Sequence, residues 1–156
     1  MYSRILVAVD GSEPSTRAFE ETLRLAADQH AVVRVVHVID LGISLAPWAQ
    51  MAFVNYDQVE TALRESGAHI VDTALARAHD AGVEAESAIL ETDVDDVAGE
   101  ILAEADRWKA DLVVLGTHGR RGLAHLILGS VAEGVVRRTR GPVLLLRQPD
   151  DAVPGG

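Results

Sequence analysis

The stretch that decides the fold is LVVLGTHGRRGLAHLILGSV, residues 112–131. It begins as an apolar run typical of a buried strand, continues through four glycines, and ends at Gly129 and Ser130, where a helical pattern begins. Glycine loses more backbone entropy on folding than other residues and adds no packing, so four in one connection indicate tight turns or close approach to a ligand. The stretch therefore predicts a strand, a ligand-facing loop and a helix in succession.

The rest of the chain alternates between strand-like and helix-like patterns. Runs rich in β-branched and aliphatic residues predict strands at residues 5–9, 32–38, 84–89, 112–115 and 143–146. Amphipathic patterns between them predict helices at residues 15–30, 57–81, 95–108 and 130–140. With right-handed crossovers, this alternation predicts an α/β fold: an open five-stranded parallel sheet in order 3-2-1-4-5, with helices on both faces.

A sheet of this order has a defined place for a ligand. Its strand order reverses between the first and fourth strands, and ligands bind outside the carboxyl ends of the strands at such a switch point. The loops that meet there begin at residues 9–12 and 116–122. The glycine stretch therefore lies at the expected crevice.

Two familiar phosphate loops do not fit the stretch. A Walker A loop needs Gly-Lys-Ser/Thr, and residues 112–131 contain no lysine. A Rossmann fingerprint needs Gly-x-Gly-x-x-Gly after the first strand. What remains is Gly116-x2-Gly119-x9-Gly129-Ser130, which places free backbone amides at two turns and at a helix N-terminus. We interpret it as a phosphate cradle made from backbone, with Arg120 or Arg121 as a counter-charge.

Positive charge is concentrated around this cradle. Residues 107–147 carry eight Lys and Arg against two acidic residues, a local net charge of +6 in a chain of net charge −10, which leaves −16 on the rest. An acidic chain is not typical of a general nucleic-acid binder. The concentration indicates a small-anion site, although solvent-exposed helix and strand-edge charges would give the same count.

Length and composition indicate one globular domain. The 156 residues are 48% hydrophobic and 24% charged, and we assign residues 1–148 to a single domain and residues 149–156 to a flexible C-terminal tail. No run approaches the ~20 apolar residues of a membrane span, and the N-terminus lacks a signal-peptide pattern. No cysteine is present, which excludes thiol catalysis. We expect a cytoplasmic protein with neither a membrane nor a nucleic acid as partner.

The glycine spacing also carries a family resemblance. Gly-x2-Gly-x9-Gly-Ser, preceded by DLVVLGTHGRRGL and followed by VAEGVVRRTRGPVLLLR, closely resembles the ATP-binding branch of the universal stress protein family. The segments ILVAVDGSEPSTRAFEETLRLA and VRVVHVID are similar to that family too, so the resemblance covers nearly the whole chain. It implies a Rossmann-like fold of the adenine nucleotide alpha hydrolase-like type that binds ATP together with Mg.

The resemblance assigns residues to the nucleotide pocket. By that likeness, Val38 contacts adenine, Leu115 and Gly116 close over the base and ribose, and the glycine spacing holds the phosphates. Asp10 points toward the ribose or toward the phosphates and Mg. The implied pocket residues are Ala8, Val9, Asp10, Val38, Leu115, Gly116, Gly119, Arg120, Gly129, Ser130 and Val131.

The resemblance also implies a partner and an activity. Family members commonly dimerise through their last strands, which here is Val143–Leu146. Our leading hypothesis is an ATP-dependent regulator in the stress response that is not an enzyme. The alternative is a slow ATPase or nucleotidyl-transferring enzyme on the same fold, for which the sequence shows no clear water-positioning base or arginine finger.

Several polar residues have simpler explanations than ligand binding. Asp10 could accept amide hydrogen bonds near Ser12, and Ser130 could be an ordinary N-cap. The acidic cluster at residues 93–96 is explained more simply by helix capping than by a metal. No histidine shows metal-ligand spacing, and His118 and His125 have no evident carboxylate to orient them for catalysis.

One connection exceeds the usual loop length. Residues 41–56 carry Trp48, Met51, Phe53 and Tyr56. A connection this long is often a lid or a partner surface. We favour the simpler expectation that it packs its own aromatic residues on the body of the protein.

Overall fold

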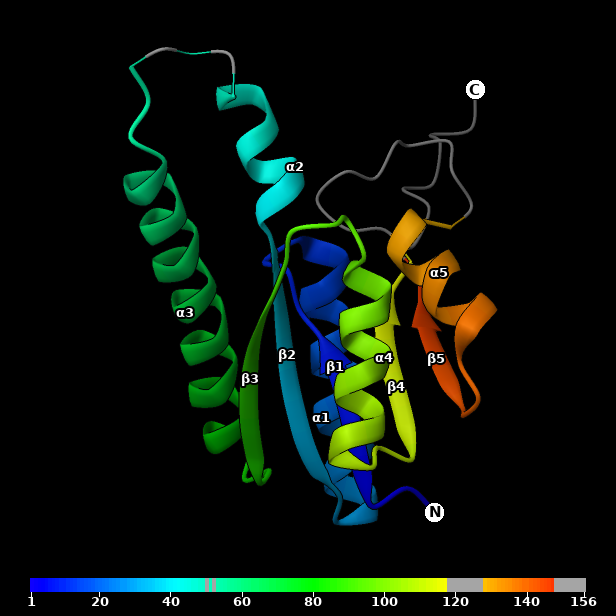
Figure 1. The fold of residues 1–156 in the computed structure, drawn as a ribbon. Helices are drawn as coiled ribbons and strands as arrows, with labels where there is room; N and C mark the ends of the chain where they lie inside the picture. Colours follow the sequence, from blue (N-terminus) through cyan, green and yellow to red (C-terminus); the bar gives the residue numbers. More distant parts are fainter. Residues whose placement is uncertain (50, 52, 118–127, 148–156) are drawn as a thin grey trace, which may run out of the picture.

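The computed structural model describes residues 1–49, 51, 53–117 and 128–147, and it contains one parallel sheet (Figure 1). The five strands lie in the order β3-β2-β1-β4-β5. All their pairings are parallel, which confirms the predicted topology. The strands are β1 (Arg4–Ala8), β2 (Val32–Asp40), β3 (Ala85–Thr92), β4 (Leu112–Gly116) and β5 (Val143–Leu146).

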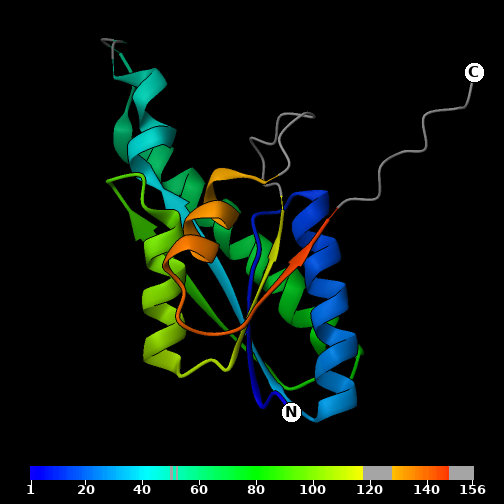
Figure 2. The same cartoon turned by 90° about the vertical axis from the view of Figure 1, so that its right-hand side faces the viewer.

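Helices cover both faces of the sheet, as predicted (Figure 2). One face packs against α1 and α3, and the other packs against α4 and α5. Within the described part of the chain, every helix is too short or too polar to cross a bilayer. The helices are α1 (Glu13–Gln29), α2 (Leu41–Leu45), the 3-10 helix η1 (Ala46–Trp48), α3 (Tyr56–Asp80), α4 (Val97–Trp108) and α5 (Ser130–Arg138).

The central strand β1 is apolar along its length because it is buried on both sides. Ile5 and Val7 belong to the core cluster under α1 and α3, whereas Leu6 belongs to the cluster under α4 and α5. All three side chains are fully buried. Alternate residues of a strand point to opposite faces, so a strand covered twice needs a continuous apolar run.

Side-chain caps fix where the helices start. Ser12 accepts a hydrogen bond from the Ser15 N–H and caps α1, and Asn55 does the same for α3 through the Gln58 N–H. Asp96 caps α4 by accepting from the Gly99 N–H at 3.0 Å. The prediction that the acidic cluster caps a helix is therefore confirmed for Asp96.

The expectation that residues 41–56 pack their large side chains on the body is wrong for Met51 and Phe53. The connection begins with α2 and η1 and projects beyond the sheet next to the start of α3 (Figure 1). Phe53 is 101% exposed and Met51 56% exposed, so these two side chains lie mostly in solvent, whereas Trp48 and Tyr56 are 41% and 40% exposed. Helix α2 starts at Leu41, directly after Asp40, the last residue of β2. The segment therefore leaves the end of the sheet as a helix and runs away from the core.

A buried ion pair ties β2 to α4 near the amino ends of the strands. Arg34 donates to Glu104 Oε1 from Nε at 2.9 Å and from Nη2 at 2.6 Å. The Glu104 side chain is only 1% exposed, and it also accepts from Arg107. Arg34 further pairs with Glu86 of β3 at 2.9 Å. Every charged side chain of this network has an oppositely charged partner. The cost of burying the Glu104 carboxylate is therefore offset as long as both of its arginine partners are present.

We predict that Glu104→Ala lowers the free energy of unfolding by about 3 kcal/mol, because the guanidinium of Arg34 loses the buried one of its two carboxylate partners. Urea denaturation followed by circular dichroism measures the change. The control is Glu21→Ala, which removes the exposed i,i+3 pair with Arg24 and should cost less than about 1 kcal/mol. Equal losses in the two variants would contradict a stabilising role for the buried pair.

Candidate functional site

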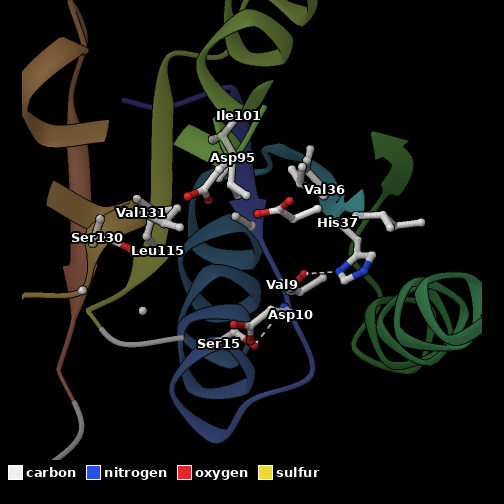
Figure 3. Close-up of a pocket in the computed structure, with 18 of the residues that line it drawn as sticks. Val9, Asp10, Ser15, Val36, His37, Asp95, Ile101, Leu115, Ser130 and Val131 are labelled. Atoms are coloured by element: carbon white, nitrogen blue, oxygen red, sulfur yellow. Dashed lines mark hydrogen bonds between the residues drawn. The ribbon is translucent and has the colours of Figure 1, made fainter. Parts of the chain in front are cut away.

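A cavity of about 320 Å³ opens at the carboxyl ends of the strands, at the switch point between β1 and β4 (Figure 3). The sequence-predicted pocket residues that line it are Ala8, Val9, Asp10, Val38, Leu115, Gly116, Gly129, Ser130 and Val131. The other two predicted residues, Gly119 and Arg120, lie outside the described residues, as do Arg121, His118 and His125.

Other lining residues were missed by the sequence reasoning. Asp40 ends β2 and Asp95 precedes α4, so both follow from the rule that strand ends meet at one edge, once the element bounds are known. Residues from α2 and α3 had no such signal. The missed residues are Ser15, Val36, His37, Ile39, Asp40, Ser44, Leu63, Ser66, Asp95, Val97, Ile101, Thr117 and Ala132.

Hydrogen bonds fix the turn that follows β1. The Ser12 N–H donates to Asp10 Oδ1 at 2.9 Å, and the Asp10 N–H donates to Ser15 Oγ at 3.2 Å. Gly11 between them has φ of 78°, a left-handed conformation that glycine adopts without strain. The prediction that Asp10 accepts an amide hydrogen bond near Ser12 is confirmed, and the same bonds hold its carboxylate at the cavity wall.

The loop after β4 is anchored where it leaves the sheet. Thr117 donates its N–H to the Leu146 carbonyl at 2.9 Å, and its own carbonyl accepts from the Gly129 N–H at 2.6 Å. Gly116 allows α1 to approach, because a Cβ there would lie 2.9 Å from the Pro14 carbonyl carbon. The end of β4 and the start of α5 are thereby joined directly at the cavity.

The N-terminus of α5 faces the cavity, and its cap residue has no side chain that could accept from the first turn. The predicted N-cap role of Ser130 is wrong, because the Gly129 carbonyl accepts from the Glu133 N–H at 2.9 Å and Gly129 is therefore the cap residue. Glycine has no side chain to cap the first turn. The amides of a first helical turn have no intrahelical acceptor and carry the positive end of the helix dipole, so Ser130 and Val131 present an anion-binding surface.

The cavity combines this polar end with an apolar wall. Figure 3 shows Ser130 and Val131 on one side and Val36 and His37 on the opposite side. Apolar side chains from β1, β2, α3, α4 and β4 also line the cavity, among them Leu115 of β4. Pockets for small ligands usually have such apolar linings with a few placed polar groups. The arrangement suits a molecule with a flat apolar part and an anionic part.

An ion pair holds α5 against α4. Arg138 Nη2 donates to Asp96 Oδ1 at 2.6 Å, and Nη1 donates to Oδ2 at 3.2 Å. The hydrogen bond from Arg138, and next the one from the Gly99 N–H, lower the pKa of Asp96 below the ordinary value of an aspartate. The helices also approach closely at Gly134, where a Cβ would lie 2.8 Å from that of Ala98. These contacts help to set the position of the α5 N-terminus.

Comparison with known proteins gives a consistent match. The chain matches the model of the universal stress protein family over residues 1–147. A universal stress protein of Methanocaldococcus jannaschii is 31% identical over 150 residues, which cover 96% of this chain and 84% of that protein.

Solved structures of the same family have the same fold. A protein from the universal stress protein family of Burkholderia pseudomallei is 34% identical, with a TM-score of 0.75 and coverage of 93% of this chain and 96% of that one. A universal stress protein solved in complex with cAMP is 27% identical, with a TM-score of 0.66 and coverage of 94% and 97%.

The contact between Asp96 and Arg138 predicts a pH-dependent contribution to stability. Because the folded-state pKa of Asp96 lies below its unfolded value, the pair stabilises the fold above the ordinary carboxyl range, and this contribution is lost as the pH falls through the folded pKa. The stability difference between the wild type and Arg138→Gln should therefore shrink from about pH 7 to about pH 3.

An NMR titration of the Asp96 carboxyl tests the cause. Arg138→Gln should raise its pKa toward the ordinary value, whereas Arg137→Gln, which removes the same charge from the neighbouring position of α5, should change it less. Equal shifts in the two variants would show that net charge, and not the direct hydrogen bond, lowers the pKa.

Proposed function

This chain belongs to the universal stress protein family, and we propose that its crevice binds an adenine nucleotide, ATP in preference, as the signal of a cytoplasmic stress regulator. The observation that carries the proposal is a cavity at the switch point that joins an apolar wall to the first turn of α5, whose cap residue is a glycine. The relative solved with cAMP supports the adenine nucleotide. The preference for ATP rests on the spacing of Gly116, Gly119 and Gly129.

The base would lie against β2 at Val38. Peptide groups at even positions of β2 face β1, since the Val32 N–H donates to the Ser3 carbonyl and the Val36 carbonyl accepts from the Val9 N–H. The register with β1 ends at Ala8 and Val36. Val38 is next in that series, and the described part of the chain offers it no strand partner on this side. Its N–H and carbonyl suit the acceptor N1 and the donor N6 of adenine.

The phosphates would lie at the other end of the cavity. The amides of Ser130 and Val131, with the dipole of α5, favour an anion there. Carboxylate oxygens suit Mg²⁺, and Asp10 would supply one. Among the described residues, no group of three or more acidic or histidine side chains could hold a metal. We propose that Mg²⁺ binds to this chain together with the nucleotide phosphates, whose charge it would neutralise.

The proposed output is a change of conformation or partner. The chain would bind and orient the nucleotide, while the cavity wall keeps the base away from water. Hydrolysis, the alternative considered from the sequence, would appear as phosphate release by the wild type above the background of a Gly129→Val variant.

We predict that the wild type binds ATP with Mg²⁺ in isothermal titration calorimetry, and that Gly129→Val weakens binding by about 100-fold or more. Gly129 has φ of −71° and ψ of 159°, an extended conformation that valine adopts readily, so the fold should survive. The added side chain would occupy space next to the phosphate-binding amides. The control is Gly141→Val, since a Cβ at Gly141 has no atom within 4 Å.

The absence of ATP binding by the folded wild type at millimolar concentrations would end the proposal. If both glycine variants bind as the wild type does, the phosphates do not lie at the N-terminus of α5.

We also propose that two copies pair through their β5 strands. β5 is an edge of the sheet, and the peptide groups at its even positions face β4, since the Thr117 N–H donates to the Leu146 carbonyl and the Pro142 carbonyl accepts from the Val113 N–H. The N–H and carbonyl of Leu145 therefore point outward. An edge strand with free peptide groups is a template for pairing with a second chain.

Leu145→Pro should convert the dimer into a monomer in light scattering, because proline removes an outward N–H without removing a bond to β4. Leu144→Pro is the contrasting variant, since it removes an inward N–H and should lower the melting temperature further. A wild type that is a monomer, or a Leu145→Pro variant that stays dimeric, would contradict pairing through β5.

A further inference from the structure

We propose that His37 is a positioning residue that makes the crevice selective for adenine, because its imidazole takes the Val9 carbonyl and leaves the Val38 N–H to the base. The inference rests on the proposed nucleotide site. His37 lies on β2, is only 7% exposed, and lines the cavity. Its Nδ1 is 2.8 Å from the Val9 carbonyl oxygen (Figure 3). A carbonyl can only accept, so Nδ1 carries the hydrogen.

The Val9 carbonyl would otherwise belong to the sheet. In a parallel ladder, the rung after the bond from Val9 N–H to Val36 would join the Val38 N–H to the Val9 carbonyl. In the part of the chain that the structure describes, this hydrogen bond does not form, and the pairing of β1 with β2 ends at Ala8 and Val36. The ring of His37 replaces the missing donor. The ladder therefore ends one rung early, at the cavity.

The ring fits because α3 leaves space for it. Gly67 of α3 packs on the imidazole, and a Cβ at that position would lie 2.8 Å from His37 Cδ2 and 3.3 Å from Nε2. Gly67 is itself buried within the helix. The ring is therefore held between α3 and the end of β1, with its Nδ1 directed at Val9. Val9 is 7% exposed, so water does not readily replace the donor.

The consequence is a choice between bases. With the Val38 N–H available, the cavity edge offers a donor and an acceptor from one residue, which match the acceptor N1 and the donor N6 of adenine. Guanine in the same orientation presents a donor at N1 and an acceptor at O6, so both contacts would be lost. Without a donor at position 37, Val38 would bond to Val9 and the edge would offer adenine no donor.

Three variants separate this role from general packing. Asn places an amide N–H where Nδ1 lies, so His37→Asn should keep ATP affinity within about threefold of the wild type. Gln places its amide one bond farther out, and Leu has no donor. Both His37→Gln and His37→Leu should weaken ATP binding by about tenfold or more and reduce the preference for ATP over GTP by a similar factor. Calorimetry with the two nucleotides measures both.

Hydrogen exchange without nucleotide gives a second readout that packing alone would not produce. The Val38 amide should exchange more slowly in His37→Leu than in the wild type, because it then bonds to Val9, and at the wild-type rate in His37→Asn. If the wild type binds no adenine nucleotide, the proposed function and this inference both fall. If the wild type binds but the three variants bind alike, or Val38 exchange is unchanged in His37→Leu, only this inference falls.

Discussion

The unequal lengths of neighbouring strands create the crevice. β1 stops at Ala8, whereas β2 beside it continues to Asp40, and β4 on its other side continues to Gly116. The central position is therefore vacant for the last rungs of the sheet, and the turn at residues 9–12 leads directly into α1. If β1 were as long as its neighbours, it would occupy this position and hydrogen-bond to the ends of β2 and β4. The early end of β1 is the constraint on which the cavity and the exposed edge at Val38 both depend.

The end of the cavity that we propose binds an anion is made mainly of backbone. The basic count over residues 107–147 overstates the charge available there, because Arg107 pairs with Glu104 and Arg138 pairs with Asp96. The first pair lies within α4 and the second joins α5 to the start of α4, so both arginines act on the architecture. What faces the cavity is the first turn of α5, whose direction is fixed by those contacts. An amide cradle needs such fixed helices, because its dipoles attract an anion only where they point together.

The sequence was most informative where burial or backbone geometry limits the choice of residue. Leu6 and its neighbours must be apolar on both faces of β1, and Gly116 must lack a Cβ beside Pro14, so such patterns allowed the strand order to be predicted. The family resemblance supplied nine of the residues that line the cavity, but thirteen others were missed. Ser44 and Leu63 could not be predicted, because they reach the cavity through the path of α2 and α3, which no local pattern specifies. The cap at Gly129 was missed because serine is the commoner cap residue.

The two sides of the cavity differ in how firmly they are held. The sheet ends and α5 belong to the buried core clusters. The start of α3 is linked to β3 by Arg64 and Glu91, a pair with half-exposed side chains that contributes little stability in water. Ser44 and Leu63 nevertheless line the cavity, and the exposed Phe53 lies on the same segment. The proposed regulatory function requires a conformational response to a ligand, and we expect it in α2 and the start of α3, where the ion pair to the sheet is half exposed.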